Sequence, residues 1–387
     1  MLPPHLYVHV PFCGRRCSYC DFSIAVRRVI PVADYLEGIR LELNGLGATC
    51  AIGGEADSVA QSVVRQQDRG SWNLDTLYLG GGTPSRLGGE GVESLLRLIR
   101  ERATFSADAE ITLEANPEDV TPEAVDAWTG AGVNRVSLGA QSFNDGVLAW
   151  MHRTHSASRI AEAVRMLRGG GISNLSLDLI FALPAEIDRS WTEDMDAAIA
   201  LDPEHVSLYG LTVEPATPLE RWTAAGRVSH TSEERYAEEF LQAHKRLTSH
   251  GFDHYEVSNF ARPGRAARHN SAYWTGASYL GIGPSAHSYD GASRRWNVKP
   301  YAEWLRILRG GSSATEGAEV IGPESADAER AYLGLRTNIG YRLCAADRYA
   351  VEQWVRAGWA AIDGDLVRLN PEGWLRLDSL AGGLTVS

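Results

Sequence analysis

The sequence "CGRRCSYCDF" (Cys13–Phe22) indicates both the fold and the site, because it holds three of the chain's five cysteines within eight residues. An apolar run, Leu6–Val10, precedes it and has the composition of a buried strand. In folds of alternating strands and helices, functional groups collect on the loops that follow the strands. In a reducing compartment, crowded thiols bind metal or do redox chemistry more often than they form disulfides.

Outward from this loop, short apolar runs alternate with helix-period segments over about two hundred residues, as expected for βα units around a parallel sheet. The predicted fold class is therefore α/β. Six strands are predicted, over residues 6–10, 76–79, 110–115, 135–138, 175–181 and 205–211. Helices are predicted over residues 33–46, 160–167, 233–249, 300–309 and 323–336.

The chain divides into three predicted parts. Residues 1–230 hold the alternating strands and helices, with a surface insertion at 47–71, which is rich in Gln, Ala, Ser and Gly. Residues 231–299 complete the sheet or link it to the C-terminal part. Residues 300–387 form a small C-terminal domain whose tail, "AIDGDLVRLNPEGWLRLDSL", reads as strand, turn, strand and helix. That order is compatible with a winged-helix-like module.

Composition narrows the class of protein. Of 387 residues, 44% are apolar and 22% are charged, as in ordinary globular chains and unlike disordered ones. The net charge of -12 opposes non-specific binding to nucleic acid or anionic lipid. No run approaches the ~18 apolar residues of a membrane span, and the first residues lack the pattern of a secretory signal. A cytoplasmic protein is predicted.

The cysteine triplet alone admits more than one interpretation. It could form a structural Cys₃His zinc site with His5 or His9, or it could be three unrelated buried thiols. An iron–sulfur cluster normally takes four thiolates, so three would leave one iron open to a small molecule. Ordinary packing or a surface thiol is the simpler role for the remaining cysteines, Cys50 in the predicted insertion and Cys344 in the tail.

The CxxxCxxC spacing, with Tyr19 before the last cysteine, resembles the radical S-adenosylmethionine (SAM) superfamily. The resemblance implies a [4Fe–4S] cluster on Cys13, Cys17 and Cys20, whose open iron binds the methionine moiety of SAM. It also implies a partial (β/α)₆ barrel and the capacity to release a 5′-deoxyadenosyl radical.

Further polar groups stand at the predicted strand ends. The run Gly80–Gly82 can bring backbone close to a ligand, although a tight βα turn would also require it. Glu114, Gln141, Arg153 and Asp178 suit ribose hydroxyls or a carboxylate, although each could be a structural hydrogen-bonding group. Together they resemble the coproporphyrinogen dehydrogenase-like (HemN) branch. That resemblance implies a SAM site of Tyr7, Gly81, Gly82, Thr83, Glu114, Gln141, Arg153, Asp178 and Thr212, with Arg153 on the methionyl carboxylate.

Two features resemble the HemW group within this branch, a group regarded as haem chaperones. Phe22 replaces a fourth cysteine, and few residues precede Cys13. "RHNSAYW" (Arg268–Trp274) matches the HNxxYW motif of that group, which implies His269 as a haem ligand and Tyr273 and Trp274 against the macrocycle. A histidine bonded within a loop beside two core aromatics is the alternative.

The same stretch offers cations for haem propionates. "ARPGRAARHN" brings Arg262, Arg265 and Arg268 together as a candidate clamp, with a solvated loop as the equally simple interpretation.

The resemblance implies a haem chaperone that binds a [4Fe–4S] cluster, SAM and haem. Its expected partners are respiratory or other haem-accepting proteins, with a flavodoxin- or ferredoxin-like electron donor. The alternatives are an oxygen-independent coproporphyrinogen III decarboxylase and a HemN-like radical methylase.

Overall fold

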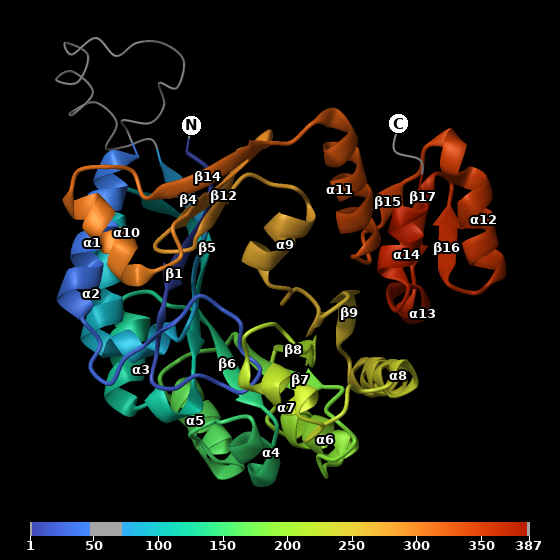
Figure 1. The fold of residues 1–387 in the computed structure, drawn as a ribbon, viewed down its shortest axis with the longest axis horizontal. Helices are drawn as coiled ribbons and strands as arrows, with labels where there is room; N and C mark the ends of the chain where they lie inside the picture. The colour runs from blue at the N-terminus through green and yellow to red at the C-terminus, as the bar shows by residue number, and fades with distance from the viewer. Residues whose placement is uncertain (1, 47–71, 385–387) are drawn as a thin grey trace.

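The computed structural model describes residues 2–46 and 72–384, and its centre is one nine-stranded sheet in the order β11-β1-β4-β5-β6-β7-β8-β10-β9 (Figure 1). The strands from β11 to β8 run parallel, and β10 and β9 join antiparallel at the far edge. Their bounds are β1 His5–Val10, β4 Asn73–Gly81, β5 Thr104–Ala115, β6 Arg135–Gln141, β7 Leu175–Phe181, β8 His205–Gly210, β9 Asp253–Glu256, β10 Asn259–Ala261 and β11 Leu280–Ile282.

The α/β prediction is confirmed, and the six predicted strands are β1, β4, β5, β6, β7 and β8. No pairing joins β9 to β11 in the described residues, so the sheet curves without closing, as a partial barrel does. The predicted insertion at 47–71 lies outside the described residues.

Most of the helices that alternate with the strands follow the outer side of the curved sheet (Figure 1). Their bounds are α1 Val32–Gly45, α2 Gly88–Arg100, α3 Pro122–Gly130, α4 Asp145–Trp150, α5 Ala157–Gly169, α6 Trp191–Ala200, α7 Pro218–Ala224 and α8 Glu233–Ser249. The strands between them are buried on both faces, and Leu77, Leu113 and Leu177 have no exposed surface. Burying each such side chain contributes about 1.5–3 kcal/mol to folding. This core fixes where the strand ends lie.

A second sheet, of β12 His287–Tyr289, β13 Ser293–Asn297 and β14 Thr315–Val320, connects to the first through Glu42 of α1. The Glu42 carboxylate accepts hydrogen bonds from Gly283 N, Asn297 Nδ2 and Trp304 Nε1, at 2.6–3.0 Å. Trp304 belongs to α10 (Tyr301–Arg309), which packs on α1. Burial raises the pKa of Glu42 to about 7.

The C-terminal unit begins with α11 (Pro323–Leu335) and contains a three-stranded sheet, β15-β17-β16. The predicted strand, turn, strand and helix of its tail are confirmed as β16, β17 and the helices α13 and α14. The remaining bounds are β15 Tyr341–Arg342, α12 Arg348–Arg356, β16 Ala360–Asp363, β17 Leu366–Leu369, α13 Pro371–Trp374 and α14 Leu377–Gly382. No helix in the described residues is both long enough and apolar enough to cross a membrane.

Candidate functional site

The loop that carries the cysteines leaves β1 and folds back on itself. Its short strands β2 (Phe12–Cys13) and β3 (Ala25–Val26) pair in parallel, and Ala25 N donates to Pro11 O at 2.7 Å. Two further backbone hydrogen bonds hold it from outside: Ser18 N donates to Met151 O, and Leu219 N donates to Ser18 O. All three thiols are therefore on one anchored loop at the carboxyl end of the sheet.

Two of the three thiols, Cys13 and Cys17, have a partner at the sulfur atom, and two, Cys13 and Cys20, have a raised pKa. Cys13 Sγ lies 3.4 Å from Thr83 Oγ1, and Arg153 Nη1 donates to Cys17 Sγ at 3.5 Å. Burial raises the pKa of Cys13, and it raises that of Cys20 to about 11. A bound cation is what would turn such thiols into thiolates.

One zinc ion and an iron–sulfur cluster require different distances between the thiols. With Zn–S bonds of about 2.3 Å, the sulfurs of one tetrahedral site lie within about 4 Å of each other. Among the residues that the structure describes, no three His, Cys, Asp or Glu side chains are gathered for one metal ion. A multi-iron cluster spreads its thiolates more widely, because each binds a different iron.

The glycines that end β4 are required by close packing against β1 and the cysteine loop. Gly81 has φ +109°, and a Cβ on Gly82 would lie 2.7 Å from the carbonyl carbon of Pro11. The backbone amide of Gly81 donates to Glu114 Oε2 at 3.1 Å. The two interpretations of the glycine run, a tight turn and a close approach of backbone, therefore both hold for Gly81 and Gly82.

Two carboxylates stand at neighbouring strand ends. Tyr78 Oη donates to Glu114 Oε1 at 2.8 Å, and burial raises the pKa of Glu114 to about 7. Ser137 Oγ donates to both oxygens of Asp178, at 2.9 and 3.1 Å, and burial raises the pKa of Asp178 as well. Tyr7 stacks on Tyr78 with ring centroids 6.1 Å apart, so it borders the same space.

Arg153 joins the carboxyl end of the sheet to the cysteine loop. Besides Cys17, it donates to Asn116 Oδ1 at 2.6 Å and to Gly139 O at 3.0 Å, while its Nε is buried without a partner. Gln141, at φ +68°, stands beside it, since a Cβ on Gly139 would lie within 3.1 Å of both side chains. The unpartnered N–H is suited to an added carboxylate.

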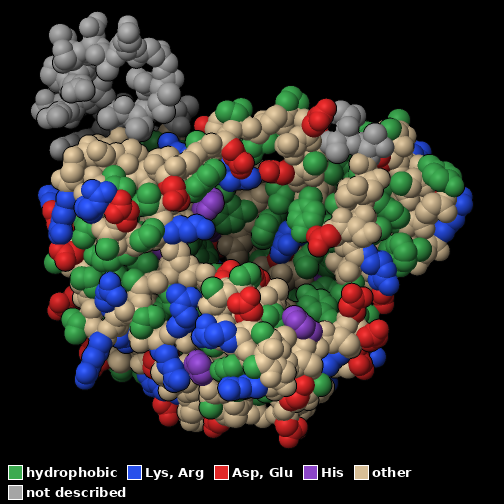
Figure 2. Space-filling model, viewed as in Figure 1, with side chains coloured by type: hydrophobic (Ala, Val, Ile, Leu, Met, Phe, Trp, Pro, Cys, Tyr) green, Lys and Arg blue, Asp and Glu red, His purple; other side chains and the backbone are tan. Residues whose placement is uncertain are grey.

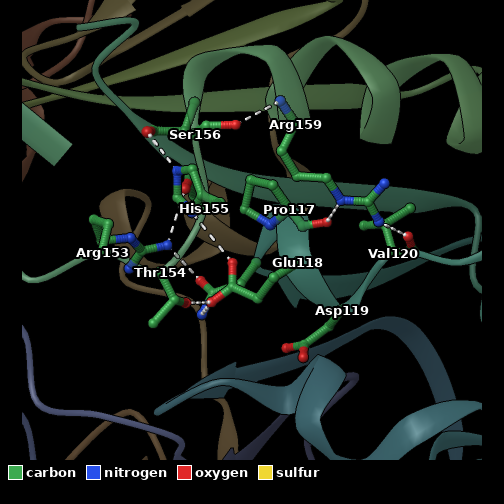
Figure 3. Close-up of polar contacts among 12 residues, drawn as sticks. Pro117, Glu118, Asp119, Val120, Arg153, Thr154, His155, Ser156 and Arg159 are labelled. Carbon is green, nitrogen blue, oxygen red and sulfur yellow. Dashed lines mark hydrogen bonds and ion pairs between the residues drawn. The ribbon is translucent and has the colours of Figure 1, made fainter. Parts of the chain in front are cut away.

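Glu118 lies close to Arg153 (Figure 3), and its charge acts on the guanidinium. Burial favours its protonation, but hydrogen bonds from His155 and Thr154 and the charge of Arg153 lower the pKa of Glu118 to about 2. The short helix η3 (Pro117–Asp119) that carries it is held by Arg159, which donates to Pro117 O at 3.1 Å. Asn116 and Glu118 were not among the predicted residues, although "NPED" directly after a strand was the available signal.

Of the residues predicted for SAM, the structure brings most together at this edge. Cys13 contacts Thr83, Cys17 contacts Arg153, and the Gly81 amide donates to Glu114. Thr212 follows β8 on the same edge but is exposed, and its hydroxyl donates only to Gly210 O at 3.4 Å.

His269 is buried in α9 (Arg268–Trp274), with 1% of its surface exposed. Its Nδ1 lies 2.7 Å from Thr76 Oγ1 and its Nε2 lies 2.8 Å from Tyr273 Oη. Burial lowers the pKa of His269 to about 3. Binding haem iron through either nitrogen of this imidazole would require it to give up the hydrogen bond at that nitrogen, so its role as ligand stays a prediction.

A cavity of about 1450 Å³ lies between the main sheet, α9 and the C-terminal unit, and Figure 2 shows the molecule hollowed there. Tyr7 and His9 of β1, Tyr273 and Trp274 of α9, and Tyr341 of the C-terminal unit all border it. The predicted SAM residue Tyr7 thus borders the same cavity as the two aromatics predicted for haem.

The expected arginine clamp is not supported by the positions of its members. Arg262 pairs with Asp202 at 2.8 Å, and Arg268 pairs with Asp108 at 3.2 Å. Neither these two nor Arg265 borders the cavity.

Comparison with known proteins agrees with this geometry. Residues 7–198 match the radical SAM superfamily. The haem chaperone HemW of Mycobacterium tuberculosis is 36% identical over 98% of this chain and 94% of its own, and that of Bacillus subtilis is 33% identical over 86% and 83%. The solved structure of coproporphyrinogen III oxidase (HemN) from Escherichia coli has a TM-score of 0.80 at 22% identity, over 98% of this chain and 90% of its own, which shows a shared fold.

This superfamily implies a [4Fe–4S] cluster and SAM, and the residues present fit both groups. Three thiols share one anchored loop, glycines bring backbone against it, and a buried guanidinium N–H lacks a partner beside it. The chain belongs to the radical SAM superfamily and, within it, to the HemW type.

Proposed function

We propose that this protein is a haem chaperone, which holds a [4Fe–4S] cluster and SAM at the carboxyl edge of its sheet and passes haem to acceptor haem proteins. The observation that carries the proposal is the similarity to HemW relatives over 98% of the chain, which includes the C-terminal unit. The cavity between that unit and the sheet supplies the space that a macrocycle needs, being larger than the ~300–1,000 Å³ of ordinary ligand pockets.

In this proposal Cys13, Cys17 and Cys20 hold the cluster. When bound, cluster and SAM together supply one-electron and radical chemistry. Arg153, fixed by Asn116 and Glu118, pairs with the methionyl carboxylate, and Glu114 and Asp178 accept hydrogen bonds from the nucleoside. Gly81, Gly82 and Thr83 line the place where the methionyl group meets the loop, next to Tyr7.

Gln141 completes the proposed nucleoside site beside Arg153, and Thr212 borders it from the end of β8. Tyr273 and Trp274 provide flat aromatic surface for haem. The partners are haem-accepting proteins, respiratory ones among them, together with a flavodoxin- or ferredoxin-like electron donor. Free thiols on the cluster loop favour a reducing compartment, the cytoplasm.

The alternative enzyme, an oxygen-independent coproporphyrinogen III decarboxylase, is less favoured. Phe22 stands where the resemblance places that enzyme's fourth cysteine, and the similarity to the solved coproporphyrinogen III oxidase, at 22% identity, supports the fold alone.

The test is a haem titration of the anaerobically reconstituted protein, followed by the Soret band, with product analysis on coproporphyrinogen III alongside. We expect saturable binding of one haem per chain and no protoporphyrinogen. Decarboxylated product without saturable haem binding would overturn the proposal in favour of the enzyme.

A further inference from the structure

The cavity is bordered by many aromatic side chains and few groups that can bind iron. Its aromatic members come from β1, α9, the second sheet and the C-terminal unit: Tyr7, Tyr273, Trp274, Tyr279, Tyr289, Tyr332 and Tyr341. Such a surface suits a flat macrocycle. Among the residues that the structure describes, neither cysteine nor methionine borders the cavity, and its two carboxylates, Glu329 and Asp378, are held by Arg294 and Tyr332. The candidate iron ligands are therefore the tyrosines and two histidines, His9 and His287.

Five of the six tyrosines are poor iron ligands here, because a phenolate is needed and burial opposes it, and the sixth, Tyr289, donates its hydroxyl to Gly291 O at 3.0 Å. Burial raises the pKa of Tyr7, Tyr273 and Tyr279 above the ordinary value, and it does the same for Tyr332 and Tyr341.

His9 is also engaged. Its Nδ1 lies 3.1 Å from Tyr7 Oη, and its Nε2 lies 3.1 Å from Ser23 O, so both ring nitrogens have partners. His269, the histidine of the HNxxYW motif, does not border the cavity and is engaged in the same way.

His287 differs from both. It is exposed, it borders the cavity from β12, and its ring nitrogens make no hydrogen bond to any residue that the structure describes. The indole of Trp296, its cross-strand neighbour, stacks on the His287 ring and so orients it. The ring centroids are 6.0 Å apart and the angle between the ring planes is 27°. Partial burial and the charges of Arg294 and Lys299 lower the pKa of His287, which favours the neutral imidazole that metals bind.

A cation for a propionate also borders the cavity. Arg342 of β15 borders the cavity and, within the described part of the chain, forms no ion pair, whereas Arg294 pairs with Glu319 and Glu329, and Arg330 pairs with Asp327. A guanidinium free of carboxylates is the one suited to receive a new one.

We infer that haem occupies the cavity between the main sheet and the C-terminal unit, with His287 as its axial iron ligand and Arg342 pairing with a propionate. The inference rests on the proposed function and names the residues that would serve it. It assigns the second sheet a binding role, and it gives the HNxxYW helix the role of a wall, with His269 holding Tyr273 in place by their 2.8 Å hydrogen bond.

The experiment is a ferric haem titration of full-length protein, read by affinity and by the Soret spectrum, with His287→Gln, His287→Met and His269→Ala. His230→Ala is the control, since His230 is exposed but lies outside the cavity. Loss of groups that merely orient a metal ligand costs about 10- to 100-fold in affinity, so His287→Gln should cost at least tenfold. His287→Met should retain binding with a shifted spectrum, because methionine is an alternative haem ligand.

The outcomes separate the two proposals. If wild type binds haem and His287→Gln leaves affinity and spectrum unchanged, the ligand assignment is overturned while the chaperone proposal stands. A spectrum lost in His269→Ala but kept in His287→Gln would return the role of ligand to the HNxxYW motif. Absence of saturable binding by wild type would overturn both. Arg342→Ala should weaken binding without moving the Soret band, because a propionate contact does not touch the iron.

Discussion

Glu114 is the side chain at which burial and hydrogen bonding oppose each other most directly. Donors from Tyr78 and Gly81 favour its carboxylate, yet burial raises its pKa from 4.5 to about 7. A carboxylate can accept about four hydrogen bonds, so Glu114, which accepts two within the protein, can accept another from a ligand hydroxyl.

Glu114 should make stability depend on pH. Because its folded pKa is raised, its contribution is fully present below the unfolded value near 4.5 and is lost as pH rises through about 7. Relative to Glu114→Gln, cluster-free wild type should lose on the order of 3 kcal/mol of unfolding free energy between pH 4.5 and 8. Urea unfolding measures this. Glu42 titrates in both proteins, so its effect cancels in the difference between their unfolding free energies. The control is Glu93→Gln, at an exposed position. A difference between wild type and Glu114→Gln that does not change with pH would contradict the assignment.

Gly82→Ala tests the close approach of β4 to the cysteine loop. The new Cβ would meet the backbone of Pro11 and Phe12 at 2.7–2.9 Å, and backbone cannot move aside as a side chain does. We expect a loss of about 1–3 kcal/mol in stability and fewer iron atoms per chain after reconstitution. Gly130→Ala, where a Cβ meets nothing within 4 Å, should leave iron content unchanged. Equal iron content in both variants would show that the loop tolerates displacement.

The sequence predicted the site residues that stand at strand ends, because strand order alone brings such positions to one edge. It did not predict Tyr78, which is the second donor to Glu114, or His287, which reaches the cavity from a separate sheet. A single aromatic or histidine in a short strand carries no pattern of its own, so only the folded arrangement of distant segments reveals it.

Among the elements, the cysteine loop depends on its neighbours for shape. The ring of Tyr19 packs against a small apolar cluster of Val147, Met151, Ile180 and Leu183, apart from the main core. Together with the backbone bonds of Ser18, this packing fixes the loop to α4 and the start of α7.

Tyr19→Ala should therefore loosen the loop before it unfolds the protein. Removing a fully buried aromatic ring costs about 3 kcal/mol or more, and the partly buried ring of Tyr19 should cost less, as a loss of order in the loop. We expect iron per chain to fall after reconstitution and amide hydrogens around residues 13–20 to exchange faster, while Tyr19→Phe keeps the packing and most of the iron. If both variants lose iron equally, the hydroxyl and not the ring is what matters.

Long apolar runs predicted their elements well. Strand β7 covers 175–181 and helix α8 covers 233–249, each as expected from its periodicity. Strand β5 begins at Thr104 and not at residue 110, because its first residues are polar and partly exposed. Strands β9, β10 and β11 were not predicted, since three or four residues within a glycine-rich segment do not display an alternating pattern.

Across the whole molecule, a buried ion pair joins the C-terminal unit to the sheet. Arg336 lies 2.9 Å from Glu256 of β9 and covers the ring of Trp274 at 4.2 Å. Backbone bonds from Val257 N to Arg336 O and from Asn338 N to Tyr255 O accompany it. This junction forms beside the cavity wall and holds its two sides together.

Arg336→Met should weaken that junction by about 3–5 kcal/mol, because it leaves the Glu256 carboxylate buried without its cation. Hydrogen exchange should rise in β9 and α11 together. The double variant Arg336→Met/Glu256→Gln removes the charge as well and should recover most of the loss. A double variant no more stable than the single one would show that the ion pair contributes nothing specific.

The position of β1 inside the sheet also sets an order of events during synthesis. One edge of β1 pairs with β4, but the other pairs with β11, which begins only at Leu280. At ~5–20 residues per second, that second edge waits for tens of seconds on the ribosome. The cysteines emerge directly after β1, long before the strand that completes their support, so assembly of the cluster belongs to the end of translation or after it.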